Sequence, residues 1–305
     1  MELVEKRVAK PEKVGWRFEK GDEVVPRRYA LANLGGGHDY EAYLAWDDEL
    51  YTLVVIKILR PTVVDNERSL RRIRREASVL DKLQHPLIVR AFGAVLDGPR
   101  PHLRLEYVEG ANLSDLLDAG PLEVDQVLPL GLRLCSALHF MAARDVIHLD
   151  IKPSNVILGS QPRLIDFSIA RSTERARRAT SSIGTDLYMA PEQCDPPKLG
   201  PLTPAADVWG WGATMWHALS GRAPFRRRKG YDTDDPHQRW PQLEGSPRKL
   251  PASVPPELGG CLTACLSKSP RARPSPAELA EIIENLIVDD DVYGEAALDP
   301  GAGEA

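Results

Sequence analysis

Cysteine is scarce in this sequence of 305 residues, which contains only four. They are Cys135, Cys194, Cys261 and Cys265. So few cysteines in so long a chain exclude a disulfide framework. Cys261 and Cys265 are four residues apart, which suits a metal pair, but no matching His/Cys pair lies near them in the sequence. We interpret both as small core residues, and we expect a reducing, cytoplasmic location.

Long apolar runs are also missing. The longest, residues 208–221, has 14 residues and includes His217. A membrane-spanning helix needs about 20 apolar residues, so we expect this run to be a buried helix. The first 13 residues are charged throughout and lack the apolar region of a signal peptide. The sequence therefore predicts no membrane insertion.

Basic residues are absent after Arg273, whereas nine acidic residues follow it. Residues 1–273 hold 39 basic and 35 acidic side chains, and neither part is charged enough to predict nucleic-acid binding. Aromatic residues make up 6%, hydrophobic residues 43% and charged residues 27%, as in globular proteins. Residues 289–305 are acidic and rich in Gly and Ala, so we predict a disordered tail there.

Strand-like patterns dominate the first third of the chain and helical patterns the rest. The predicted strands are residues 28–34, 40–46, 50–59, 89–96 and 102–107, with one helix at 66–83. The later helices are residues 113–117, 124–144, 204–219, 257–266 and 276–288. This segregation predicts an α+β fold with a small β-rich N-lobe (about 25–107) and a larger helical C-lobe (about 108–288), after an N-terminal extension of residues 1–24.

A glycine-rich hairpin and a buried lysine form the first candidate site. Gly35, Gly36 and Gly37 lie between two strands, where backbone N–H groups can cover phosphates; a plain hairpin turn is the alternative. Lys57 is the one charge in an apolar strand, so it needs an anionic partner. Glu76 lies on the apolar stripe of the following helix, and we expect it to pair with Lys57; a surface pair with Arg72 is the alternative.

The second candidate site is the segment Asp150-Ile-Lys-Pro-Ser-Asn155, followed by Asp166-Phe167. Asn155 and Asp166, if they converge, supply the oxygen ligands that Mg²⁺ prefers. Asp150 is then free to accept a proton from a hydroxyl nucleophile, and Lys152 to neutralise charge on a transferring phosphoryl group. The alternative is a capping Asp and a loop Asn without chemical roles.

These segments, together with Gly184-Thr185, Tyr188-Met-Ala-Pro-Glu192 and Asp207, resemble the signature set of protein kinases. The resemblance runs from about Tyr29 to Leu286 and is strongest to the eukaryotic-like (Hanks-type) serine/threonine kinases of bacteria. It implies the bilobal protein-kinase fold, with ATP and Mg²⁺ as cofactors and proteins carrying Ser/Thr as substrates.

The resemblance also implies roles for particular residues. The catalytic set is Asp150 as base, Lys152, Lys57, Glu76 and Thr185, and the metal ligands are Asn155 and Asp166. The residues expected to bind ATP are Gly35, Gly37, Ala42, Val55, Lys57, Leu105, Glu106, Val108 and Ile157. The resemblance further implies that Asp207 anchors the catalytic loop, beyond matching a helix dipole, and that Glu192 pairs with Arg273.

Five positions depart from the family pattern. Tyr40 stands where a third loop glycine is expected, and Ser168 replaces the glycine after Asp166-Phe167. The exchanges at Ala42 and Val55 roughly conserve volume, which favours retained nucleotide binding.

Leu149 takes the place of the arginine that usually precedes the catalytic aspartate. Because that arginine is the usual partner of an activation-segment phosphate, we predict that activity depends weakly on phosphorylation of Thr180, Ser181 or Ser182.

Three functions compete at this point. The first is a serine/threonine protein kinase that transfers the γ-phosphoryl group of ATP, with a signalling role. The second is an ATP-binding pseudokinase that acts as a scaffold or regulatory module, motivated by Tyr40 and Ser168. The third is a small-molecule phosphotransferase, which the segment from Gly184 to Glu192 disfavours. The sequence does not fix an oligomeric state.

Overall fold

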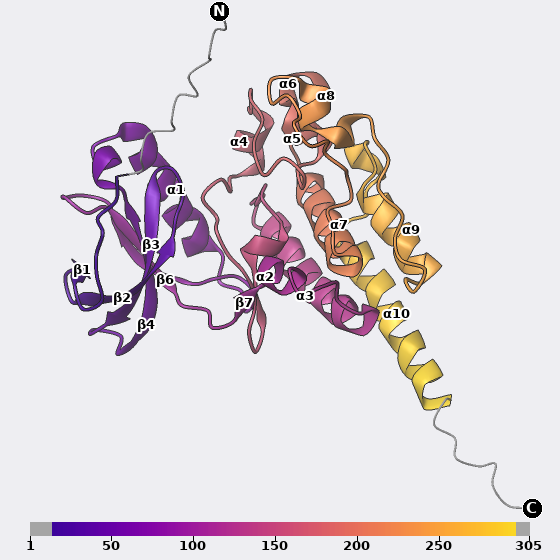
Figure 1. Ribbon diagram of the computed structural model, residues 1–305, viewed down its shortest axis with the longest axis horizontal. Helices are drawn as coiled ribbons and strands as arrows, with labels where there is room; N and C mark the ends of the chain where they lie inside the picture. Colours follow the sequence, from indigo (N-terminus) through magenta and orange to yellow (C-terminus); the bar gives the residue numbers. More distant parts are fainter. Residues whose placement is uncertain (1–13, 297–305) are drawn as a thin grey trace, which may run out of the picture. The chain divides into compact units, whose positions relative to one another are not determined.

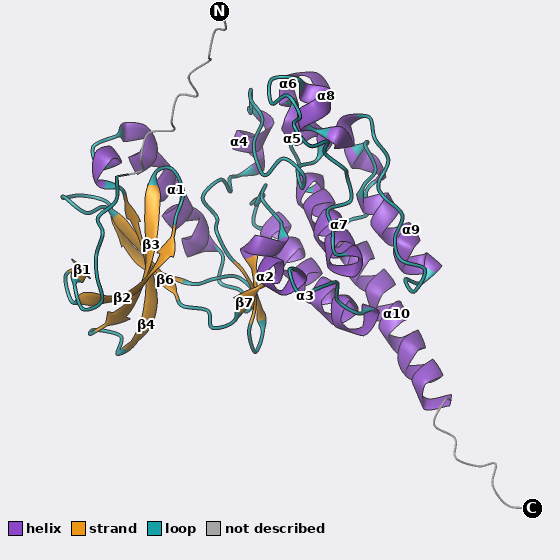
Figure 2. Cartoon of the chain, viewed as in Figure 1, coloured by secondary structure: helices purple, strands orange, loops and turns teal. Residues whose placement is uncertain are grey.

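The computed structural model describes residues 14–296 and divides into two compact units (Figures 1 and 2). The first unit comprises the residues up to Ala77 together with Ala91–Tyr107, and the second comprises Ser78–Arg90 and the chain from Val108 onwards.

The first unit is built on a six-stranded antiparallel sheet with strand order β1-β2-β3-β4-β6-β5. The strands are β1 (Glu23–Val25), β2 (Arg28–Gly35), β3 (Tyr40–Asp47), β4 (Thr52–Leu59), β5 (Ala91–Val95) and β6 (His102–Glu106). Helix α1 (Glu67–Lys82) follows β4 after a short 3-10 turn at Pro61–Val63. β4 begins later than predicted, because a turn with Tyr51 at φ 53° precedes it.

One face of this sheet carries the apolar core of the first unit. On one face, buried Tyr43, Ala45, Val54, Ile56 and Ile58 form a core with Val24, Val25 and Ala30. Trp16 and Phe18 pack against this core, and the indole N–H of Trp16 donates to the carbonyl of Leu59 at 2.7 Å. The described part of the predicted N-terminal extension therefore covers one face of the sheet.

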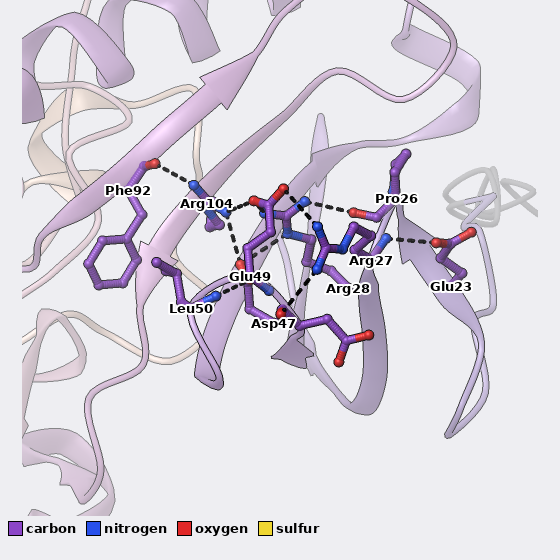
Figure 3. Close-up of polar contacts among 10 residues, drawn as sticks. Glu23, Pro26, Arg27, Arg28, Asp47, Glu49, Leu50, Phe92 and Arg104 are labelled. Atoms are coloured by element: carbon purple, nitrogen blue, oxygen red, sulfur yellow. Dashed lines mark hydrogen bonds and ion pairs between the residues drawn. The ribbon is translucent and has the colours of Figure 1, made fainter.

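Asp47 is the centre of a polar network at the end of β3 (Figure 3). Its carboxylate is fully buried and accepts hydrogen bonds from Arg28 Nε and Arg104 Nη1, each at 3.0 Å. It also accepts from the backbone N–H groups of Glu49 and Leu50 at 2.8 and 3.0 Å. The network ties β2, β3 and β6 together through one carboxylate.

The second unit is mainly helical, with a three-stranded sheet of order β7-β8-β9. These strands are β7 (Ala111–Asn112), β8 (Val156–Leu158) and β9 (Pro162–Leu164). Its helices are α2 (Leu113–Leu117), α3 (Val124–Ala143), α4 (Thr173–Arg177), α5 (Pro191–Cys194), α6 (Pro196–Leu199), α7 (Ala205–Ser220), α8 (Pro236–Arg239), α9 (Pro256–Cys265) and α10 (Pro276–Ala296). Short 3-10 turns lie at Pro153–Asn155, Pro241–Leu243 and Pro270–Ala272.

Helices α3, α7 and α10 form the centre of the second unit, where α3 packs against both of the others. Trp211 of α7 is buried, and its indole N–H donates to the carbonyl of Gly131 in α3 at 3.1 Å. By length and composition alone α3 could cross a membrane, but half of its apolar window is buried inside the protein. A buried core helix meets the same criterion, and we interpret α3 in that way.

Helix α10 extends beyond its predicted end at Val288 and continues to Ala296. Residues 289–293 contain neither Gly nor Pro, so no stop signal ends the helix there. The backbone of residues 289–296 continues α10. The rest of the predicted tail, residues 297–305, lies outside the described residues.

Candidate active site

The glycine hairpin between β2 and β3 needs its glycines for steric reasons. Gly35 and Gly36 have φ values of 91° and 156°, which residues with a Cβ rarely adopt. A Cβ on Gly36 would lie 2.3 Å from the carbonyl oxygen of Tyr40. A Cβ on Gly37 would lie 2.8 Å from the Tyr40 ring. Tyr40 itself does not have a positive φ, so the tyrosine at the expected glycine position is accommodated without backbone strain.

Lys57 and Glu76 form the predicted buried pair. The ammonium nitrogen lies 2.8 Å from Glu76 Oε1, and both side chains are less than a tenth exposed. The Tyr40 ring lies beside the ammonium, 4.0 Å from its centroid. Arg72, the alternative partner of Glu76, instead pairs with Asp39 at 2.6 Å.

Strand register places four of the predicted ATP-contacting residues of the first unit on one face of the sheet, namely Ala42, Val55, Lys57 and Leu105. Ala42 lies opposite Lys57 across β3 and β4, and Val55 lies opposite Leu105 across β4 and β6. Directly opposite residues share a face, and alternation puts this face opposite the core of Tyr43 and Ile56. Glu106 ends β6, and Val108 and Ile157 belong to the second unit.

In the second unit, Asp150, Lys152 and Thr185 form a closed hydrogen-bonded triad. Lys152 Nζ donates to Asp150 Oδ2 and to Thr185 Oγ1, each at 2.7 Å. The Thr185 hydroxyl donates in turn to Asp150 Oδ1 at 2.6 Å. Each side chain is held by the other two, so the carboxylate of Asp150 is fixed next to a cation.

Asn155 and Asp166 are brought together by the backbone. The Ile165 N–H donates to the carbonyl of Asn155 at 2.9 Å, which puts Asp166 one residue from that contact. The side-chain amide of Asn155 donates through Nδ2 to the backbone oxygen of Asp150 at 2.9 Å. The side-chain amide oxygen of Asn155 is therefore the atom left to act as a ligand. Ser168 does not have a positive φ, so this position does not require glycine.

Asp207, at the start of α7, anchors the catalytic loop. Its two carboxylate oxygens accept from the backbone N–H groups of His148 and Leu149, each at 2.7 Å. Burial raises the pKa of Asp207 to about 7, although the two N–H donors oppose this shift. The anchoring role is therefore confirmed, and Asp207 does more than match the helix dipole.

Leu149 joins the catalytic loop to the segment that contains Thr185. It is buried and has a positive φ of 68°. Its carbonyl accepts from Gln193 Nε2 at 2.8 Å, and the same amide also donates to the carbonyl of Ile183 at 2.8 Å. Gln193 was not predicted from the sequence, because a glutamine inside a short helix carries no signal of such a contact.

Glu192 and Arg273 form the predicted ion pair. The guanidinium contacts both carboxylate oxygens, at 2.6 and 2.8 Å, and both side chains are almost fully buried. Arg273 also donates to the backbone oxygens of Ala205 and Ser267 at 2.9 and 2.8 Å. This pair ties α5 to the beginning of α7 and to the chain after α9.

A carboxylate held beside a lysine and a threonine, with an amide and a second carboxylate close by, is the equipment of a phosphoryl-transfer enzyme. A protein kinase domain profile matches residues 29–283, and the chain belongs to this family. The predicted family and the predicted α+β bilobal fold class are thereby confirmed. ATP binding and Mg²⁺ use are typical of the family.

Bacterial kinases are among the relatives. The serine/threonine-protein kinase PknB of Mycobacterium leprae is 31% identical over 85% of this chain and 42% of that protein. PkaA of Streptomyces coelicolor is 34% identical over 74% of this chain and 42% of that protein, and pkn2 of Myxococcus xanthus is 34% identical over 64% and 24%. The chain thus spans less than half the length of these curated relatives.

Proposed function

We propose that the protein is an ATP- and Mg²⁺-dependent serine/threonine protein kinase. The observation that carries this proposal is the triad of Asp150, Lys152 and Thr185. Asp150 orients a substrate hydroxyl and accepts its proton as the oxygen attacks the γ-phosphorus of ATP, and ADP leaves. Lys152, held 2.7 Å from Asp150, neutralises charge that develops on the transferred phosphoryl group.

The residues fit the two cofactors. Asn155 and Asp166 supply oxygen ligands, and Lys57, oriented by Glu76, supplies a cation for the phosphates of ATP. Among residues 14–288, no group of three or more His, Cys, Asp and Glu side chains is placed to hold a metal ion. A Mg²⁺ ion here would take its remaining ligands from phosphate and water, which is its usual preference. When bound, it would neutralise charge on the phosphates.

The pseudokinase alternative is less well supported. It rests on Tyr40 and Ser168, neither of which has a positive φ or removes a predicted metal ligand. The Lys57–Glu76 pair and the Asp150 triad are both formed, which favours an active enzyme. A small-molecule phosphotransferase is disfavoured by the relatives, which are named serine/threonine-protein kinases.

The decisive experiment uses purified protein with labelled ATP, Mg²⁺ and a generic protein substrate. The parent is expected to transfer label, and Asp150→Asn and Asp166→Ala should each abolish transfer. A thermal-shift titration with ATP runs in parallel. Binding of ATP by the parent without any transfer would support the pseudokinase and overturn the kinase proposal.

Weak dependence on activation-segment phosphorylation is a further part of the proposal. Leu149 is buried, and its backbone N–H and carbonyl are hydrogen-bonded to Asp207 and Gln193. A phosphate on Thr180, Ser181 or Ser182 therefore has no arginine at position 149 with which to pair. We expect phosphorylation of the segment to raise kcat/KM less than about tenfold. A larger increase, measured on protein before and after phosphatase treatment, would contradict this expectation.

We also propose a cytoplasmic signalling role without nucleic-acid binding or membrane insertion. The support is that cysteine is scarce, that the charge is not extreme, and that the apolar window of α3 is half buried inside the protein. Cell fractionation followed by immunoblotting tests the location. Recovery of the protein in the membrane fraction after a high-salt wash would contradict it.

A further inference from the structure

The segment that precedes the first strand packs closely on the sheet of the first unit. We call residues 14–18 the N-terminal strap. Trp16 Nε1 donates to the backbone oxygen of Leu59 at 2.7 Å, and the Trp16 ring stacks on Phe18 with the ring centroids 5.8 Å apart. The guanidinium of Arg100 lies 5.3 Å from the centroid of the Trp16 ring and 5.0 Å from that of Phe18. The strap is therefore a packed part of the first unit.

A carboxylate at the start of β3 connects the strap to an arginine. Glu41 Oε2 accepts from the backbone N–H of Trp16 at 2.8 Å, and Glu41 Oε1 lies 3.3 Å from Arg60 Nη1. The side chains of Arg60 and Glu41 are only 10% and 7% exposed. A Cβ on Gly15 would lie 2.3 Å from Glu41 Oε1, so glycine at this position allows the close approach of the strap. The carboxylate is thus held between the strap and the guanidinium.

Arg60 in turn holds the glycine hairpin. It directly follows β4, and its Nε donates to the backbone oxygen of Gly37 at 3.2 Å. Its backbone N–H donates to the carbonyl of Asp39 at 2.9 Å. A turn rich in glycine has many accessible backbone conformations, so contacts from outside the turn are needed to keep one of them. Arg60 supplies two such contacts.

The same hairpin touches the cation that is proposed to bind phosphate. A Cβ on Gly37 would lie 2.8 Å from the Tyr40 ring, and the centroid of this ring lies 4.0 Å from the Lys57 ammonium. Gly37 therefore contacts Arg60 through its carbonyl and lies against the ring that covers Lys57. The contacts run without a break from the strap to this ring, and all of them lie within the first unit.

We propose that the N-terminal strap, acting through Glu41 and Arg60, positions the glycine hairpin for the phosphates of ATP. A hairpin that is fixed before ATP binds loses less conformational entropy on binding, and the affinity for ATP is higher as a result. Glu41 precedes Ala42 on β3, so the two side chains point to opposite faces of the sheet, and Glu41 lies on the face away from the predicted ATP contacts. The inference rests on the proposed ATP-dependent function and adds Trp16, Glu41 and Arg60 to it as positioning residues.

The test compares two ligands on the intact protein. Isothermal titration calorimetry measures the dissociation constants of ATP with Mg²⁺ and of adenosine, which lacks the phosphates. Trp16→Ala and Arg60→Ala should each weaken ATP binding about tenfold and adenosine binding less than about twofold, because each removes one or two hydrogen bonds of the chain that holds the hairpin. The KM for ATP should rise with the dissociation constant, whereas kcat should change much less. Gly15→Ala, which displaces the Glu41 carboxylate and keeps Trp16, repeats the test if Trp16→Ala does not fold.

A double variant and two controls decide the cause. Trp16→Ala/Arg60→Ala should weaken ATP binding little more than either single change, because both act through one chain of contacts. Trp46→Ala changes a half-buried tryptophan near the other end of β3, and Arg28→Ala changes an arginine of the polar network in Figure 3. Both controls should lower the melting temperature and keep the ratio of the ATP and adenosine affinities.

The outcomes separate this inference from the kinase proposal. Unchanged ATP affinity in the strap and Arg60 variants, or an equal loss of ATP and adenosine affinity, overturns the inference and leaves the kinase standing. Fully additive losses in the double variant, or a selective loss of ATP affinity in the controls, also overturn it. Selective loss of ATP affinity together with no phosphoryl transfer by the parent supports the positioning role and defeats the kinase proposal. A parent that binds no ATP defeats the proposed function, and the inference with it.

Discussion

Two buried aspartates, one in each unit, have pKa values shifted in opposite directions. Burial alone would raise the pKa of Asp47, but the N–H of Leu50, Arg28, the N–H of Glu49 and Arg104 together lower it to about 2. Asp207 has only the N–H groups of His148 and Leu149, and burial raises its pKa to about 7. Two backbone donors and two guanidinium groups thus accompany the lowered pKa of Asp47, whereas two backbone donors do not offset the burial of Asp207.

The two aspartates also have different tasks. Asp47 joins three strands and contacts no predicted active-site residue in the described network. Asp207 holds the two residues that precede Asp150, the proposed catalytic base. The pKa near 7 thus belongs to Asp207, whose movement would disturb the loop that leads to Asp150.

The largest expected effect comes from removing the arginine partner of a buried carboxylate in the second unit. Glu192 lies in the same unit as Asp207 but has a bidentate arginine partner. Arg273→Met leaves that carboxylate buried and unpaired, so the free energy of unfolding should fall by about 3–5 kcal/mol. Chemical denaturation measures it. Arg271→Met, at an exposed neighbour, should change stability by less than about 0.5 kcal/mol. A loss below about 1 kcal/mol for Arg273→Met would contradict the comparison.

The second prediction concerns activity. Asp207→Asn replaces one of two acceptor oxygens by an NH₂ group, which cannot accept from the backbone N–H it faces. Displacement of the loop should lower kcat/KM by about 100-fold. The matched control is Asp125→Asn, an exposed aspartate in the first turn of α3, which should retain activity. Retention of more than about a third of the activity by Asp207→Asn would show that the anchor is dispensable.

The third prediction returns to Asp47. Arg28→Met and Arg104→Met each remove one charged hydrogen-bond donor, and each should lower the free energy of unfolding by about 1.5–3 kcal/mol. The pKa of Asp47 should rise in both variants, as followed by carboxyl NMR. Arg27→Met, at an exposed arginine whose side chain does not contact Asp47, serves as the control. An unchanged Asp47 pKa in either variant would break the explanation.

The last prediction concerns the pH dependence of stability. The folded-state pKa of Asp47 lies below its unfolded value, so its contribution is complete above about pH 4 and is lost as the pH falls through about 2. Asp207 has the opposite sign: its contribution is complete below about pH 4 and is lost as the pH rises through about 7. Urea titrations of Asp47→Asn and Asp207→Asn against the parent isolate each term. Slopes of the same sign would refute the assignment.

Much of the fold and site followed from local sequence. A single lysine in an apolar strand and a glutamate on the apolar stripe of the next helix predicted the Lys57–Glu76 pair, because an isolated buried charge needs a partner. Glu192 and Arg273 were predicted by family resemblance alone. The bounds of α2, α3, α7 and α9 were predicted to within a few residues, whereas α10 continues from its predicted end at Val288 to Ala296, and short helices such as α4 and α8 were not predicted.

Other features had no local signal. Gln193 and Asp186 form hydrogen bonds with partners tens of residues away, so neither spacing nor periodicity points to them. The packing of Trp16 and Phe18 on the sheet depends on strands that come later in the chain. The apolar repeat that predicts helix α10 weakens near its predicted end. The helix itself continues, because no residue directly after that point ends it.

Leu149 uses its N–H to contact Asp207 and its carbonyl to contact Gln193, so one peptide segment is shared by two structural elements. The free energies of the catalytic loop and of the segment from Ile183 to Gln193 are therefore linked. A protein substrate that binds this segment in one conformation stabilises the matching conformation of the loop. By thermodynamic reciprocity, any ligand that orders the loop must raise the affinity for that substrate by the same factor.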